Sequence, residues 1–156
     1  MRADIEALHS LLKIKIRNYE FQFKKVPTVE VLSALLHVTL YYKRFFPYYT
    51  FNLLCGIGKE GNGVVYGYDA IGSFDILTYG AVGSAGNMCV PVLDSIFEGH
   101  NNPNAKPVPD YQVGRKGIID AMNAACEREI HKGDTMEILS ITNKGISLET
   151  IPLKID

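Results

Sequence analysis

A glycine-rich segment near the middle of the chain has the spacing of a phosphate-binding loop. Residues 56–61 match Gly-x-Gly-x-x-Gly and follow a segment rich in strand formers. Dinucleotide binding requires that a helix comes next, with its N-terminus at the pyrophosphate. Here Asn62-Gly63 and the strand formers Val64-Val65-Tyr66 follow instead. The pattern therefore predicts a hairpin turn, and a small-molecule or nucleotide-binding module is kept as an alternative function.

The thiols and imidazoles are the next groups that could do chemistry. A cysteine nucleophile needs a nearby base and a lowered pKa, and no cysteine is paired locally with a histidine. The cysteines are therefore predicted to be buried packing residues. No two histidines have the spacing of metal ligands, so neither a metal nor a cofactor is predicted, and His37, inside an apolar helix, is predicted to be a satisfied packing residue. These residues are Cys55, Cys89, Cys126, His9, His37, His100 and His131.

A basic and aromatic segment, residues 43–49, could offer a stacking platform for single-stranded nucleic acid. The whole chain, however, has 16 Lys and Arg against 17 Asp and Glu, a net charge of −1. That balance argues against a surface that neutralises phosphates, so no nucleic-acid partner is predicted. We interpret the segment as a helix end leading into a buried strand, with Arg44, Phe45 and Phe46 as packing and assembly residues.

Hydrophobic periodicity predicts the elements that must position these groups. Apolar residues three and four apart predict helices over residues 3–25 and 28–43, the second capped by Thr28. Strand formers predict a hairpin of residues 49–57 and 64–68, a turn over 69–73 and a third strand over 75–81. Ser84 is predicted to cap a helix over 85–97, with Pro91 near its first turns.

The second half of the chain repeats the alternation of helices and hairpins. Residues 98–110 are rich in proline and asparagine and predict a loop. A helix is expected over 112–131, followed by a hairpin of residues 136–142 and 146–153. Helix pairs that alternate with antiparallel hairpins are typical of an α+β layered fold.

Composition sets the broad class. With 47% hydrophobic and 21% charged residues, the chain is predicted to be one globular domain over 1–156. We expect no membrane partner, because no apolar run reaches the roughly 18 residues of a membrane helix. An odd cysteine count without a Cys-x-x-Cys pair predicts a reducing compartment.

Several segments, in order and over essentially the whole chain, resemble the proteasome beta-subunit family. The most specific is residues 42–49, which is similar to the Arg-Phe-Phe-Pro-Tyr-Tyr segment of the beta type-1 subfamily, at the sixth position of the beta ring. Residues 65–74 resemble the family's hairpin and turn, and 81–85 resemble its Gly-Ser-Ala helix entry. Residues 125–129 and 133–134 resemble its last helix and turn.

The resemblance implies a four-layer αββα sandwich of the N-terminal-nucleophile hydrolase type. Members of the family open with strands that carry a catalytic threonine and an assisting lysine. Here Met1 stands at the start of the first long helix. We therefore expect a chain that is truncated at its N-terminus and lacks these opening strands, and a divergent short form of the family is the alternative.

Three departures from active relatives imply a subunit with no catalytic residue. Exposing the threonine nucleophile requires a Gly-Thr junction, and the sequence contains no Gly-Thr dipeptide. Active relatives also have an aspartate and, three residues on, a serine, where this chain has Glu129 and Lys132. Ser84 matches a third supporting position. The leading hypothesis is a non-catalytic structural subunit, and the alternative is an active threonine endopeptidase whose catalytic segment is missing.

The resemblance also implies partners and a second site. The partners are beta subunits of the same and the opposite ring and subunits of the alpha ring, in the cytoplasm and nucleus. The turn after the second hairpin strand is expected to face a neighbouring active subunit. Asp69 and Ser73 match the residues that line this neighbour's substrate pocket, and the alternative is that both only form the turn by bonding their own backbone.

Overall fold

The computed structural model describes residues 1–98, 110–131 and 133–153. These residues form two compact units, 1–77 and 78–156. Both units combine helices with antiparallel strands, in the order of helix pairs and hairpins that the periodicity predicts, so the α+β class is confirmed. That the chain is a single domain over residues 1–156 stays a prediction, because the two units are distinguished by contacts within each of them.

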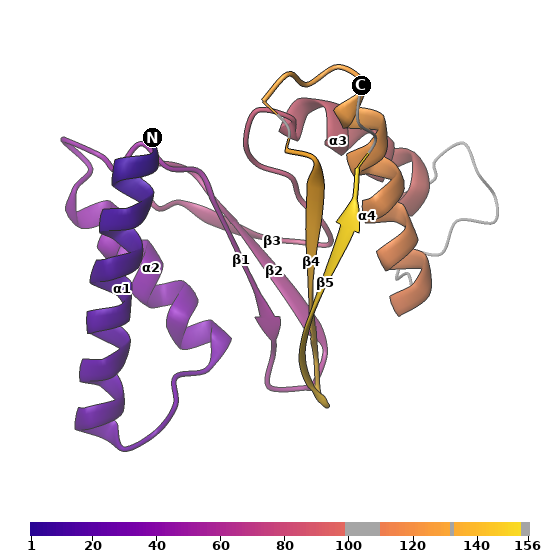
Figure 1. The fold of residues 1–156 in the computed structure, drawn as a ribbon. Helices are drawn as coiled ribbons and strands as arrows, with labels where there is room; N and C mark the ends of the chain where they lie inside the picture. The colour runs from indigo at the N-terminus through magenta and orange to yellow at the C-terminus, as the bar shows by residue number, and fades with distance from the viewer. Residues whose placement is uncertain (99–109, 132, 154–156) are drawn as a thin grey trace. The chain divides into compact units, whose positions relative to one another are not determined.

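The first unit packs two helices against a three-stranded sheet (Figure 1). The helices are α1 (Arg2–Phe23) and α2 (Val29–Tyr42), and the hydroxyl oxygen of Thr28 caps α2 by accepting from the Val31 N–H. The sheet has the order β1-β2-β3 and is antiparallel throughout. Its strands are β1 (Asn52–Ile57), β2 (Gly63–Tyr68) and β3 (Phe74–Leu77).

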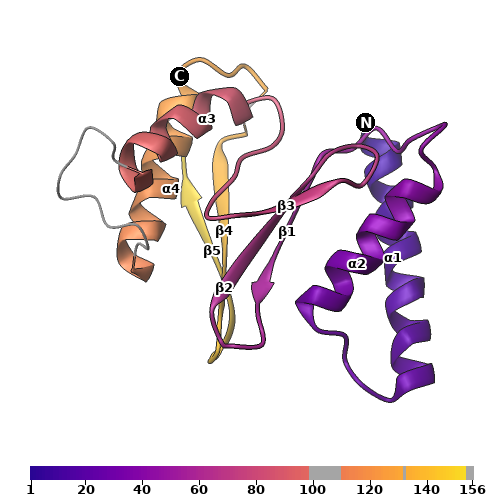
Figure 2. The same ribbon diagram turned by 180° about the vertical axis from the view of Figure 1, so that it is seen from behind.

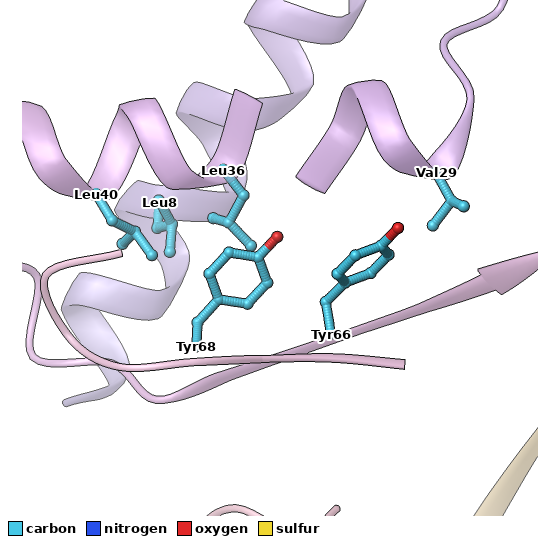
Figure 3. Close-up of a cluster of buried hydrophobic side chains, with 6 residues drawn as sticks. All are labelled: Leu8, Val29, Leu36, Leu40, Tyr66 and Tyr68. Carbon is cyan, nitrogen blue, oxygen red and sulfur yellow. The ribbon is translucent and has the colours of Figure 1, made fainter. Parts of the chain in front are cut away.

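The core of this unit lies between α1, α2 and β2. Its buried side chains are Leu8, Val29, Leu36, Leu40, Tyr66 and Tyr68. The two tyrosine rings stand up from the strand toward the helices (Figure 3). The Tyr68 hydroxyl donates to the Ser33 carbonyl at 2.9 Å, which satisfies its polar end, and burial raises the pKa of Tyr68 to about 12.

The second unit packs two helical segments and a hairpin (Figure 2). The helical segments α3 (Gly86–Leu93) and α4 (Tyr111–Cys126) lie side by side, and α3 continues as a π-helical turn, η1 (Asp94–Glu98). The hairpin joins β4 (Thr135–Thr142) to β5 (Gly145–Pro152). The buried residues are Cys89, Leu93, Phe97, Ala121, Ala125, Cys126, Met136 and Leu153.

Three predicted boundaries are wrong, and for two of them another interaction uses the backbone. β1 begins at Asn52 because both backbone polar groups of Tyr49 bond to the start of α1. β3 ends at Leu77 and does not reach residue 81. The last long helix ends at Cys126 because the carboxylate of Glu129 accepts the N–H of His131, which competes with continued helix. The loop predicted over residues 98–110 lies almost wholly outside the described residues.

The predicted N-cap of α3 is also wrong. Ala85 is the N-cap residue, and no side chain caps this end. Pro91 stands inside α3 and not in its first turn, where it removes one backbone donor from the helix ladder.

Burial of Leu40 gives a stability prediction. Its side chain is fully buried, whereas Val38 on the same helix is 58% exposed. We expect Leu40→Ala to lower the free energy of unfolding of the first unit by about 2 to 5 kcal/mol. Val38→Ala is the matched control and should change it by less than about 0.5 kcal/mol. Hydrogen exchange of α1 and α2 amides measures both, and equal effects of the two variants would show that α2 does not bury Leu40.

Candidate functional site

The turn between β2 and β3 contains both predicted pocket residues. The Asp69 carboxylate oxygen Oδ1 accepts the Ser73 N–H at 2.8 Å and the Ile71 N–H at 3.0 Å. The backbone closes the same turn, because the Asp69 N–H donates to the Ser73 carbonyl at 3.0 Å. Asp69 and Ser73 are both exposed. The turn therefore fixes the direction of the carboxylate and leaves the rest of it facing outward, as an aspartate in a tight turn does.

This turn lies on α2. His37 of α2, which is half-buried, approaches the Gly72 carbonyl with its Nδ1 at 2.7 Å. The prediction that His37 is a satisfied packing residue is confirmed. Its partner was not predictable, because nothing in the sequence around residue 37 points to a carbonyl 35 positions further on.

A second cluster joins two of the positions, Ser84 and Glu129, that the resemblance matched to catalytic support in active relatives. The Glu129 side chain is only 11% exposed, and its Oε1 accepts both the N–H and the Nδ1 of His131 at 2.8 Å. These bonds, together with one from the Ser84 hydroxyl, hold the pKa of Glu129 below its ordinary value. The structure therefore brings Ser84 to Glu129, and Lys132 lies outside the described residues.

This cluster is not a catalytic triad in its geometry. A nucleophile must bond to a base, and the base must be oriented by a third group. Here both Ser84 and His131 bond to the carboxylate of Glu129. The carboxylate is thus occupied by this chain's own donors, and the arrangement stabilises the bend after α4.

The basic and aromatic segment does not pack inside the fold as we expected. Phe45 and Phe46 are 88% and 83% exposed, so the packing interpretation of these rings is wrong. The guanidinium of Arg44 lies over the rings of Tyr41 and Phe45, at 4.9 and 4.4 Å from their centroids. Arg44, Phe45 and Phe46 form an exposed aromatic surface at the end of α2. The role of these residues in assembly stays a prediction.

The glycine-rich segment forms the predicted hairpin turn between β1 and β2. The N–H of Lys59 is already bound by the carboxylate of Glu30 at 3.1 Å. Gly56 is required by packing, because a Cβ there would lie 2.8 Å from Val29. Helix packing thus accounts for glycine at this position, and the helix that a dinucleotide site needs is replaced by β2.

The prediction that the cysteines are buried packing residues is confirmed for two of the three. Cys89 and Cys126 are buried as predicted, while Cys55 is exposed on β1, against the prediction. Burial raises the pKa of the Cys89 thiol, which disfavours the nucleophilic thiolate. Within the described residues, no group of three or more metal-binding side chains comes together. None of the described helices is both long and apolar enough to span a bilayer.

The lowered pKa of Glu129 predicts a pH dependence. A carboxyl group with a depressed folded-state pKa contributes stability that is complete above its ordinary value, 4.5, and is lost as the pH falls through the lower folded value. We expect Glu129→Gln to remove this dependence, because the amide oxygen still accepts hydrogen bonds but does not titrate. Urea unfolding of the full chain, compared between about pH 3.5 and pH 7, measures it. Parallel pH curves for the two proteins would contradict the assignment.

Comparison with known proteins places the chain in a family. The model of the proteasome subunit family matches residues 1–141, which include most of both units. The chain is 37% identical to proteasome subunit beta type-1 of Drosophila melanogaster over 158 residues, covering 99% of this chain and 67% of that protein. It is 34% identical to the Dictyostelium discoideum protein of the same name, covering 100% of this chain and 67% of that protein.

A plant relative gives the same result. The identity to proteasome subunit beta type-1 of Arabidopsis thaliana is 37% over 161 residues, covering 99% of this chain and 72% of that protein. The family match confirms the predicted fold of the N-terminal-nucleophile hydrolase type. The chain therefore belongs to the proteasome subunit family.

Proposed function

We propose that this chain works as a non-catalytic beta-type subunit of the proteasome core particle. In that role it supports ring assembly and one wall of a neighbouring active subunit's substrate pocket, in ATP- and ubiquitin-dependent protein degradation in the cytoplasm and nucleus. Its proposed partners are beta subunits of both rings and subunits of the alpha ring. The similarity to beta type-1 subunits over nearly the whole chain carries the proposal.

The geometry around Glu129 supports the non-catalytic part of the proposal. In active relatives a carboxylate and a serine assist the threonine. Here the corresponding carboxylate is engaged by His131 and Ser84. An active threonine endopeptidase, the alternative from the sequence, is not favoured, because the relatives reported above are named for the subfamily whose resemblance implied a non-catalytic subunit.

The composition of the native complex tests the proposal. The chain carries a tag and is captured from its own cells, and the mass and the subunits of the complex are determined. We expect a particle that contains other beta-type subunits and alpha-type subunits in equal copy number with this chain. Recovery of the chain in a complex without such subunits would overturn the proposed function.

The pocket role of Asp69 predicts a dependence of cleavage on the charge of the substrate. A carboxylate on a pocket wall favours cationic substrate groups, and its loss costs about 1 kcal/mol for those substrates alone. Asp69→Asn separates this charge from the turn, because the amide oxygen still accepts the N–H groups of Ile71 and Ser73. We expect particles with Asp69→Asn to cleave peptides with a basic residue three positions before the cut less well, while their other activities stay unchanged.

The control is Asp69→Ala, which removes both the charge and the turn bonds. It should lower the same activity and also raise hydrogen exchange at the amides of Ile71 and Ser73. If Asp69→Asn particles cleave matched basic and neutral peptides in the wild-type ratio, Asp69 has only its turn role.

The exposed aromatic surface gives an assembly prediction. Large exposed apolar groups that are close together mark interaction sites. Because Phe45 and Phe46 are exposed, each substitution by alanine should change the free energy of unfolding of the first unit by less than about 0.5 kcal/mol. We expect the double variant to enter particles poorly, whereas Phe45→Tyr with Phe46→Tyr, which keeps both rings, enters normally. Normal amounts of assembled particle with the alanine variant would show that this surface has no part in assembly.

A further inference from the structure

The turn that carries Asp69 is attached to α2 by one side chain. His37 Nδ1 lies 2.7 Å from the carbonyl oxygen of Gly72. A carbonyl oxygen only accepts hydrogen bonds, so Nδ1 carries the proton and donates it. The distance is at the short end of the range for N–H···O bonds. The bond therefore fixes the middle of the turn against the helix.

The backbone of the turn fits against α2 too closely for any side chain at residue 72. Gly72 is buried and has a φ of 92°, in the left-handed region. A Cβ there would lie 2.7 Å from the His37 carbonyl oxygen and 3.0 Å from the Leu40 Cβ. A side chain at residue 72 would therefore push the turn away from α2 and its carbonyl away from His37.

Aromatic contacts hold the imidazole ring of His37 in the orientation in which Nδ1 donates to the Gly72 carbonyl. The ring stacks on Tyr41, with centroids 6.1 Å apart and planes 19° apart. It also meets the Phe74 ring edge-on at 5.7 Å, and Phe74 directly follows Ser73. His37 thus contacts the turn at its middle and at its exit.

We propose that His37 is a positioning residue that aims the Asp69 carboxylate and so sets the substrate preference of the neighbouring pocket. The steps are continuous: His37 holds the Gly72 carbonyl, and Asp69 spans the same turn through its bonds to Ile71 and Ser73. A shift of Gly72 away from α2 therefore moves the carboxylate as well. This inference rests on the proposed function, because it uses the pocket role of Asp69.

The test compares two substitutions of His37 in assembled particles. In His37→Asn the amide nitrogen takes the place of Nδ1 and can donate to Gly72. In His37→Leu a side chain of similar size has no donor and leaves the buried carbonyl unsatisfied. We expect His37→Leu to reduce the preference for basic over neutral peptides by up to about fivefold, the factor that corresponds to complete loss of the Asp69 charge from the pocket wall. His37→Asn should stay within about twofold of wild type.

The double variant separates positioning from general damage. If His37 acts through the carboxylate, then His37→Leu should change the ratio no further once Asp69→Asn has removed the charge, because coupled residues are not additive. A merely structural loss would lower the cleavage of basic and neutral peptides equally in both backgrounds. If His37→Leu fails to assemble, His37→Gln replaces it, since its amide reaches beyond the Nδ1 position.

The outcomes are distinct for the two proposals. If Asp69→Asn changes the ratio while His37→Leu keeps the wild-type ratio, the positioning role is wrong and the pocket role stands. If Asp69→Asn itself has no effect, the pocket role fails and with it the effect of His37 on substrate preference, and hydrogen exchange at the amides of Ile71 and Ser73 then tests whether His37 positions the turn. Faster exchange in His37→Leu than in His37→Asn supports positioning of the turn, and equal exchange overturns it.

Discussion

The direct contact of α2 with glycine backbone is the constraint on which the first unit depends. At its N-terminal end, Val29 packs where a Cβ on Gly56 would clash, and toward its C-terminal end the helix backbone meets Gly72. These two contacts bring the helix close enough to the sheet for Tyr66 and Tyr68 to fill the space between them (Figure 3). Because interiors are close-packed, a side chain at either glycine would displace the helix and with it the turn that carries Asp69.

The same helix therefore connects a packed core with two exposed features that the proposed function uses. His37 joins it to the turn after β2, and Arg44 joins its end to the aromatic surface through Tyr41 and Phe45. In the second unit, the carboxylate of Glu129 has a comparable structural role. It accepts hydrogen bonds from His131, which stabilise the bend after α4, and from Ser84. Both sites consist of polar groups bound to this chain's own backbone and side chains. That is the arrangement expected of a subunit that shapes a particle rather than one that performs its chemistry.

Much of the fold could be predicted from the sequence, because its signals are local. Apolar spacing, the Thr28 cap and the glycine-rich turns gave the element order, and the resemblance of residues 42–49 pointed to the family that the comparisons show. What failed depends on contacts between distant residues. The start of β1 depends on Asp4, the end of α4 on Glu129 and His131, and the exposure of Phe45 on what the neighbouring elements leave uncovered. Asp69 and Ser73 form the turn that the sequence predicted, their pocket role stays a prediction, and His37 was not identified from the sequence as the support of this turn.

Covalent labelling of intact particles would show whether this chain carries an active nucleophile. An electrophilic peptide probe that reacts with N-terminal threonine nucleophiles is applied to native particles that contain this chain, and each labelled subunit is identified by mass spectrometry. We expect that other beta-type subunits of the same particle take the label while this chain takes none. Stoichiometric labelling of this chain would contradict the assignment of a non-catalytic subunit.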